Sequence, residues 1–304
     1  MAEALFDSVV DVHECRYGPM LAFAEDQVIT RSLKMYGEWA EHEIHVLAQY
    51  IRDGTMVLDV GSNIGTHALA FARRCEKSVV WGFEPRPVVS SLAEVNCIRN
   101  NARNVCIVQA ACGAKFSMVT LAGPSQNEDN AGAFKLDGVT SLHFWARLAG
   151  WLGKAVEVQP PFSRVPIIPL DSLRFPSAVS LLKVDVEGME SQVIYGARKM
   201  ISRDLPAVYF EVLDINLATE PFNLLRRLGY RCFCMETHQF NRNNFRKSSN
   251  NIWYRTELGV LALPHSISAP DGLRCVDDLS QIQCLEDARL GFDVPSCEPL
   301  INFQ

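Results

Sequence analysis

The chain has 304 residues, of which 48% are hydrophobic and 21% are charged. This is ordinary globular usage, so a wholly disordered or fibrous protein is excluded, and the length suits one large domain or two small ones. With 29 Lys and Arg against 35 Asp and Glu, the net charge is −6, which excludes a uniformly basic nucleic-acid coat and leaves a local basic patch open.

Two kinds of sequence pattern follow one another along the chain. Up to about residue 54 we expect short strands and one helix over 38–52. After that, continuous apolar runs alternate with helix candidates, and such runs are typical of strands covered on both faces of a parallel sheet. The alternation indicates right-handed βαβ crossovers and a doubly wound α/β sheet. The predicted strands are 56–60, 78–83, 105–110, 179–184, 207–212 and 230–235, and the predicted helices are 66–75, 87–102, 189–203 and 221–228.

The alternation stops over residues 121–164, a stretch too long for an ordinary connection, so we predict an insertion over one end of the sheet. Charge also segregates: 226–255 holds seven basic residues and one acid, whereas 256–304 holds eight acids and two arginines. These are either two solvated surfaces or a tail that folds onto the basic segment. We therefore predict an N-terminal cap over 1–54, a core over 55–255 and an acidic tail over 256–304.

Several features bear on the protein's environment. No apolar run approaches the length of about 18 residues that a membrane span needs. The first residues carry Glu3 and Asp7 and do not resemble a signal peptide. The 10 cysteines are scattered without a CxxC pair, which argues against a zinc ribbon or a thioredoxin-like pair. We expect a cytoplasmic protein whose thiols are free and mostly lie in the core.

The most informative motif, LDVGSNIG, follows a predicted strand and opens a predicted helix. Gly61 permits a tight turn, and Gly65 permits close approach of helix and sheet. Asn63 stands where a dinucleotide fingerprint has its middle glycine, so a nucleoside without phosphates is favoured, S-adenosylmethionine (SAM) being the common one. Glu84 lies 23 residues after Gly61, close to the spacing of about 20 at which a carboxylate meets a ribose diol.

Three segments of the chain resemble the FkbM-type SAM-dependent methyltransferases: LDVGSNIG, GFEPRP and LLKVDVEGMESQVIYGA. The resemblance covers roughly residues 30–254, and its specific element is the KVDVEGxE block. It implies a Rossmann-like SAM methyltransferase fold, with a mostly parallel seven-stranded sheet and an antiparallel last strand. Members of the family mostly O-methylate hydroxyls of sugars, polyketides and similar metabolites. The resemblance therefore implies SAM as the cofactor and a sugar or other small molecule as the acceptor.

Acidic residues stand at the ends of two predicted strands, where ligands of a parallel sheet bind. The methyl group of a sulfonium is already activated, so the enzyme must align the attack and, for a hydroxyl acceptor, remove a proton. Asp185, Glu187 and Glu211 are candidates for the catalytic base, with His238 as a fourth, and the sequence does not choose among them. Lys183 either pairs with one of these acids or faces the edge of the sheet.

Cofactor contacts are expected at the turn and at the strand ends, but some have a second interpretation. Asp185 is a base or a ligand of the methionine end of SAM. Tyr36, Glu38 and Trp39 either close over the cofactor or form a packing cluster at the start of a helix. The full set of predicted cofactor-binding residues is Tyr36, Glu38, Asp59, Gly61, Asn63, Gly65, Glu84 and Asp185.

Other functions stay open at this point. Three carboxylates could hold Mg²⁺, but no dedicated metal motif is present, so we expect no metal. N-methylation of a small molecule is the first alternative, because the same scaffold serves amines. An RNA-directed methyltransferase or RNA-binding protein would use the basic segment 226–255, against the overall negative charge. A SAM-binding protein without catalysis is the third. The oligomeric state stays open.

Overall fold

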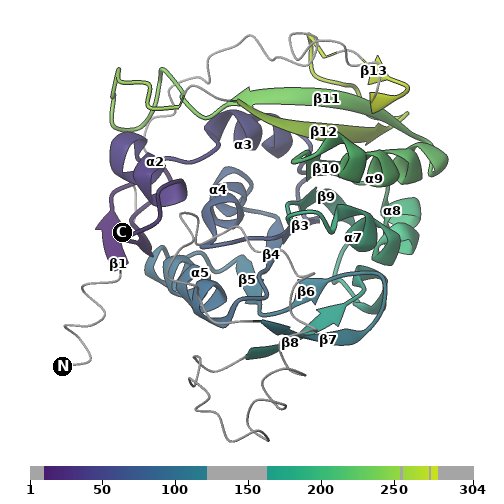
Figure 1. Ribbon diagram of the computed structural model, residues 1–304, viewed down its shortest axis with the longest axis horizontal. Coiled ribbons are helices and arrows are strands. Elements are labelled where there is room, and N and C mark those ends of the chain that lie inside the picture. Colours follow the sequence, from purple (N-terminus) through teal and green to yellow (C-terminus); the bar gives the residue numbers. More distant parts are fainter. Residues whose placement is uncertain (1–9, 122–162, 254–255, 274, 280–304) are drawn as a thin grey trace, which may run out of the picture.

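The computed structural model describes residues 10–121, 163–253, 256–273 and 275–279. Its centre is an eight-stranded sheet with the order β13-β11-β12-β10-β9-β3-β4-β5 (Figure 1). Five neighbouring strands are parallel: β5 (Val105–Val108), β4 (Val79–Phe83), β3 (Met56–Val60), β9 (Val179–Val184) and β10 (Ala207–Glu211). β12 (Thr256–Pro264) runs antiparallel to both β10 and β11 (Tyr230–His238).

Helices cover both faces of this sheet (Figure 1). On one face, α7 (Glu190–Gly196), α8 (Arg198–Asp204) and α9 (Ile215–Arg227) pack on Leu58, Leu182 and Phe210. On the other face, α3 (Glu41–Ala48) and α4 (Thr66–Arg74) pack on residues that alternate with these, among them Val57 and Leu181. Because both faces are covered, the parallel strands are apolar almost throughout, which is why the sequence predicted them.

The remaining elements lie at one side of the sheet. α2 (Ile29–Tyr36), β1 (Val10–His13) and β2 (Met20–Phe23) pack against α5 (Pro87–Arg99). A small sheet of β6 (Ala111–Cys112), β7 (Ser117–Leu121) and β8 (Ser163–Ile168) follows β5, and a short 3₁₀ turn, Leu170–Ser172, leads from it to β9. Since β7 and β8 pair antiparallel, they join the two ends of the predicted insertion, most of which lies outside the described residues.

The predicted mostly parallel sheet with an antiparallel last strand is confirmed, and the two-residue strand β13 (Cys275–Val276) adds an eighth member. The predicted helix over 189–203 is instead two helices that meet at Ala197. The predicted helix start at Pro221 is wrong, because the helix begins at Ile215, where the Asp214 carboxylate accepts a hydrogen bond from the Asn216 N–H at 2.7 Å.

The sheet continues beyond residue 255, where the sequence analysis placed the end of the core. β12 lies between β10 and β11 and supplies hydrogen bonds to both. β13 pairs with β11, and Asp277 forms a 2.8 Å ion pair with Arg226. The described part of the acidic tail therefore folds onto the basic segment.

Two further expectations concern the cysteines and membrane-spanning helices. All cysteines among the described residues are free thiols, and most of them are buried. No helix in the described ranges is both long enough and apolar enough to cross a membrane.

Candidate functional site

Two adjoining cavities lie at the carboxyl ends of the parallel strands. The first, of about 60 Å³, has largely apolar walls that include Pro85, Ala110 and Met189. The second, of about 460 Å³, is richer in polar and acidic side chains. Both cavities are lined by Gly61, Glu84, Arg86, Asp185 and Glu187. These shared residues therefore stand where a ligand in one cavity would meet a ligand in the other.

The predicted turn after β3 forms the floor between the two cavities. Gly61 has φ +86°, and a Cβ at this position would overlap the carbonyl oxygen of Asp185 on the neighbouring strand end. Asn63 also adopts a left-handed conformation, with φ 49°, and its side-chain oxygen accepts a hydrogen bond from the Ile64 N–H at 2.8 Å. Gly65, with φ 87°, immediately precedes α4. The glycines thus allow the close approach of strand, turn and helix that opens the site.

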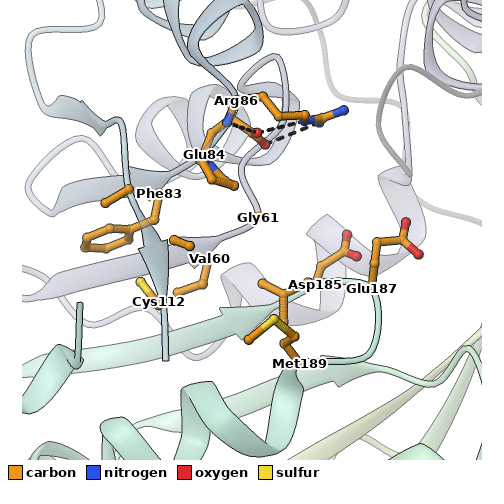
Figure 2. A pocket seen from close by; sticks show the side chains of 13 residues that line it. Val60, Gly61, Phe83, Glu84, Arg86, Cys112, Asp185, Glu187 and Met189 are labelled. Carbon is orange, nitrogen blue, oxygen red and sulfur yellow. Dashed lines mark hydrogen bonds and ion pairs between the residues drawn. The ribbon is translucent and has the colours of Figure 1, made fainter. Parts of the chain in front are cut away.

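Glu84 ends β4 and faces the gap above Gly61. Figure 2 shows Glu84 and Arg86 on one side of Gly61, with Asp185 and Glu187 on the other. Glu84 Oε1 accepts hydrogen bonds from both the backbone N–H and Nε of Arg86 at 2.9 Å. Its second oxygen has a longer contact of 3.4 Å to the same guanidinium. The carboxylate is therefore held in place and keeps an acceptor position for a ligand hydroxyl.

A buried lysine lies beneath the site. Lys183 Nζ lies 3.0 Å from Asp185 Oδ2 and 3.8 Å from Asp59 Oδ1. Burial opposes its charge, but the negative charges of Asp185 and Asp59 outweigh burial and raise the pKa of Lys183. Asp59 is fully buried and lines neither cavity. The predicted contact of Asp59 with the cofactor therefore has no support in the lining of either cavity, and the Asp59 carboxylate faces Lys183 instead.

The carboxyl groups of Asp185 and Glu211 interact at the border of the second cavity. Burial raises the pKa of Glu211 to about 11, and repulsion from Asp185 adds to this effect. Burial acts on Asp185 too, but the charge of Lys183 and a hydrogen bond from Glu211 outweigh it and lower the pKa of Asp185. These opposite shifts favour an ionised Asp185 that accepts a hydrogen bond from the protonated carboxyl of Glu211.

Glu187 occupies an uncommon backbone conformation at the junction of the cavities. It has φ 53°, and Gly188 follows with φ 100°. A non-glycine residue with positive φ costs free energy, and such residues concentrate at functional sites. The conformation turns the chain sharply between β9 and α7, so that Glu187 lines both cavities.

Three further ionisable residues line the second cavity and were missed by the sequence analysis. Glu43 comes from α3, His67 from α4 and Glu257 from β12. His67 Nε2 lies 3.0 Å from Glu43 Oε1, and the Tyr209 hydroxyl donates to Glu43 Oε2 at 2.8 Å. Burial opposes the charge of Glu43, but the neighbouring His67 ring and the ammonium of Lys183 outweigh burial and lower the pKa of Glu43.

Glu257 adds a buried carboxyl group to the lining of the second cavity. Burial, together with the charge of Glu43, raises the pKa of Glu257 to about 8, although a hydrogen bond from Gln239 acts in the opposite direction. Because Glu257 was assigned to the acidic tail, no sequence signal linked it to the site. Its place on β12, antiparallel to β10, brings it beside Glu211.

Three predicted site residues lie elsewhere. The Glu38 carboxylate is occupied by Arg16, by the Asn241 amide at 2.8 Å and by the Phe245 N–H at 2.8 Å. The Tyr36 hydroxyl accepts from the Ile252 N–H at 2.7 Å. Both join the N-terminal region to the segment after β11, whereas Trp39 lines the second cavity. His238 lines neither cavity.

Comparisons with known proteins bear on the family of the chain. A sequence profile described as the methyltransferase FkbM domain matches residues 59–232, more than half of the chain. Methyltransferase 1 of Beauveria bassiana (strain ARSEF 2860) is 29% identical over 147 residues, which cover 47% of this chain and 59% of that protein. The match thus spans less than two thirds of that relative's length.

Solved structures of low sequence identity are also similar to the chain. Methyltransferase FkbM from Methylobacillus flagellatus KT has a TM-score of 0.40 and 15% identity, and the match covers 70% of this chain and 45% of that chain. A SAM-dependent O-methyltransferase from Thermotoga maritima has a TM-score of 0.40 and 13% identity, covering 76% and 66%. Since the matched domain runs from the cofactor turn through the KVDVEG block into β11, the chain belongs to the FkbM methyltransferase family, whose methyl donor is SAM.

Proposed function

We propose that this methyltransferase transfers the methyl group of SAM to a hydroxyl of a sugar or another small molecule. The observation that carries the proposal is the junction of the two cavities at Gly61, Asp185 and Glu187. A cofactor in the first cavity would present its reactive end to an acceptor in the second.

The residues of the first cavity suit SAM. The absence of a side chain at Gly61 leaves space that a Cβ would close, and the apolar walls suit an adenine ring. Glu84, fixed by Arg86, offers its carboxylate to a ribose diol. Asp185, whose lowered pKa keeps it ionised, suits the ammonium of the methionine end. These side chains match the polar groups of SAM without a phosphate-binding element.

The charge of the second cavity supports methyl transfer. When bound, SAM supplies a methyl group on a positively charged sulfur. The carboxylates of Glu43 and Asp185, both with lowered pKa values, make the potential at the junction negative. A negative site attracts a cation and holds a neutral thioether less strongly, so we expect tighter binding of SAM than of S-adenosylhomocysteine.

Two arginines of the basic segment have partners within the protein. Arg226 pairs with Asp277, and Arg231 donates to the Ile267 carbonyl at 2.5 Å. These guanidinium groups are engaged within the protein, which weakens their use for phosphates.

The test is incubation with SAM carrying a deuterated methyl group and matched acceptors that differ in one group. Monosaccharides and phenols are paired with their amino analogues, and a structured RNA forms a third arm. Mass spectrometry of the products should show a deuterated methyl ether on the hydroxyl members. Methylation confined to the amino analogues would replace O-methylation by N-methylation. Methylation confined to RNA, or to no acceptor, would contradict the proposal.

A further inference from the structure

Neither member of the Asp185–Glu211 pair suits the removal of a proton from a hydroxyl. Asp185 has a lowered pKa and is therefore a weak base, and Glu211 already carries a proton at neutral pH. His238 lies outside the cavity lining. Of the acids predicted as bases, only Glu187 is left, so the proton of an acceptor hydroxyl passes either to Glu187 or to a group of the second cavity that the sequence analysis did not name.

The second cavity contains a histidine whose ring is held by a carboxylate. His67 is the one histidine among the described residues that line either cavity. Its Nε2 atom lies 3.0 Å from Glu43 Oε1, and both atoms are enclosed without a hydrogen-bond partner among the described residues. Within the part of the chain that the structure describes, no hydrogen bond occupies Nδ1. One ring nitrogen thus faces a carboxylate, and the other is available to the cavity.

Glu43 is itself fixed by a second contact. The Tyr209 hydroxyl donates to Glu43 Oε2 at 2.8 Å, so the two oxygens of Glu43 face two different partners. Tyr209 lies on β10 and is fully buried, and a Cβ at Gly259 on the neighbouring strand would overlap its ring. The absence of a side chain at Gly259 therefore gives Tyr209 the space to reach Glu43.

We infer that His67 is the general base of this enzyme, with Glu43 and Tyr209 as positioning residues, an inference that rests on the proposed function. A carboxylate beside one ring nitrogen orients the ring and favours the proton on that nitrogen, which leaves the other nitrogen to act as the base. The acceptor oxygen forms a bond to the methyl carbon while the carbon–sulfur bond breaks and leaves its electron pair on sulfur. The hydroxyl proton passes to Nδ1 of His67, and Glu43 stabilises the imidazolium.

Other charges face this pair from the sheet. Asp59 on β3 and Asp185 at the end of β9 both interact electrostatically with His67, and Lys183 lies between the two aspartates. Lys183 also acts on Glu43. Because several charges surround the ring, its tautomer is the most direct observable.

The first arm of the test needs no acceptor. Protein labelled with ¹⁵N-histidine and saturated with S-adenosylhomocysteine is studied by long-range ¹H–¹⁵N NMR, and the His67 signal is assigned from its loss in His67→Asn. We expect the neutral ring to carry its proton on Nε2, with Nδ1 bare, and Glu43→Gln to weaken this preference. A proton on Nδ1 with Nε2 bare would overturn the inference.

The second arm uses the acceptor that the product assay identifies. His67→Asn should lower turnover by ~10²–10⁴-fold, whereas its dissociation constant for SAM should stay within about threefold of the wild-type value. His45→Asn is the matched control, because His45 lies on α3 but lines neither cavity. Free imidazole should restore part of the turnover of a folded His67→Ala protein, which a purely structural role would not allow.

The outcomes separate the two proposals. If no acceptor is methylated, the proposed function fails, and the tautomer measurement still decides the geometry of the Glu43–His67 pair. If an acceptor is methylated and His67→Asn keeps wild-type turnover, O-methylation stands and the assignment of the base is wrong. Equal losses of SAM affinity and turnover would likewise make His67 a structural residue.

Discussion

The ammonium of Lys183 lies 3.0 Å from the carboxylate of Asp185, at the point where β9 ends beneath the cavities. The same ammonium faces Asp59, which pairs with it in the register of β3 and β9. One buried cation therefore compensates two acids, one of which lines the cavities. This arrangement keeps Asp185 ionised next to the predicted position of the reactive sulfur.

We predict that Lys183→Met lowers the free energy of unfolding by ~3–5 kcal/mol, because it leaves uncompensated buried charge at Asp59 and Asp185. Urea denaturation at pH 7 measures this. Lys77→Met is the control, since the exposed Lys77–Asp53 pair contributes little, and it should show no measurable change. Equal stability of the two variants would contradict the role of Lys183.

Gly61 should tolerate no side chain. Gly61→Ala introduces a Cβ that overlaps the Asp185 carbonyl oxygen, in addition to the cost of positive φ. Gly54→Ala is the matched control, because Gly54 also has positive φ, +74°, with no atom within 4 Å of the added Cβ. We expect Gly54→Ala to cost ~1 kcal/mol in thermal denaturation with SAM affinity unchanged. Gly61→Ala should cost more and bind no SAM; similar behaviour of the two would show that the turn can relax.

Glu84 is expected to bind the ribose of SAM. Glu84→Ala removes up to two charge-assisted hydrogen bonds, each contributing ~1.5–3 kcal/mol at most, so calorimetric titration should show a clear loss of affinity. Glu94→Ala removes an acid from the exposed face of α5, away from both cavities, and should bind SAM like the wild type. If folded Glu84→Ala binds SAM with the wild-type affinity, Glu84 has no role in cofactor binding and is only an acid at the start of a helix.

Glu211 should make the protein less stable as the pH rises. A carboxyl whose pKa increases on folding stabilises the fold below its ordinary value of 4.5, and this contribution is lost as the pH rises towards the folded value of about 11. Glu211→Gln keeps a donor for Asp185 but has no proton to lose. Melting temperatures between pH 5 and 10 should therefore fall less in this variant than in the wild type.

Glu257→Gln is the comparison for the pH experiment. The pKa of Glu257 is raised only to about 8, so its effect should be complete near that pH, whereas the effect of Glu211→Gln should continue to grow up to pH 10. Parallel melting curves for the two variants would mean that the Asp185–Glu211 pair does not hold a proton above pH 8.

The parallel strands and the cofactor turn were predictable from the sequence. β3 and β9 have the predicted bounds, because an apolar run closed by turn residues has few alternatives when both faces are covered. Gly61 and Glu84 could be placed because strand order brings the carboxyl ends of β3 and β4 together. The strand bounds depend on local sequence patterns, and the placement of Gly61 and Glu84 depends on the rule that ligands bind at the carboxyl ends of parallel strands.

The second cavity was not predictable because it is built from distant segments. Glu43 lies in the first turn of a helix, where acids are common because their charge interacts favourably with the helix dipole. Nothing in the sequence therefore distinguished it from such an acid. His67 follows the turn without any motif of its own. Glu257 joins the site only because β12 inserts between β10 and β11. Conversely, Glu38 was assigned to the cofactor, although its hydrogen bonds hold the N-terminal region to the segment after β11.

The most direct measurement of the central claim is a crystal structure of the protein with S-adenosylhomocysteine. The account predicts the adenine in the apolar first cavity, the ribose hydroxyls within hydrogen-bonding distance of Glu84, and the sulfur at the junction beside Asp185. The space in front of that sulfur should open into the second cavity towards His67. A ligand bound with its ribose away from Glu84, or with its sulfur turned from the acidic cavity, would contradict the account.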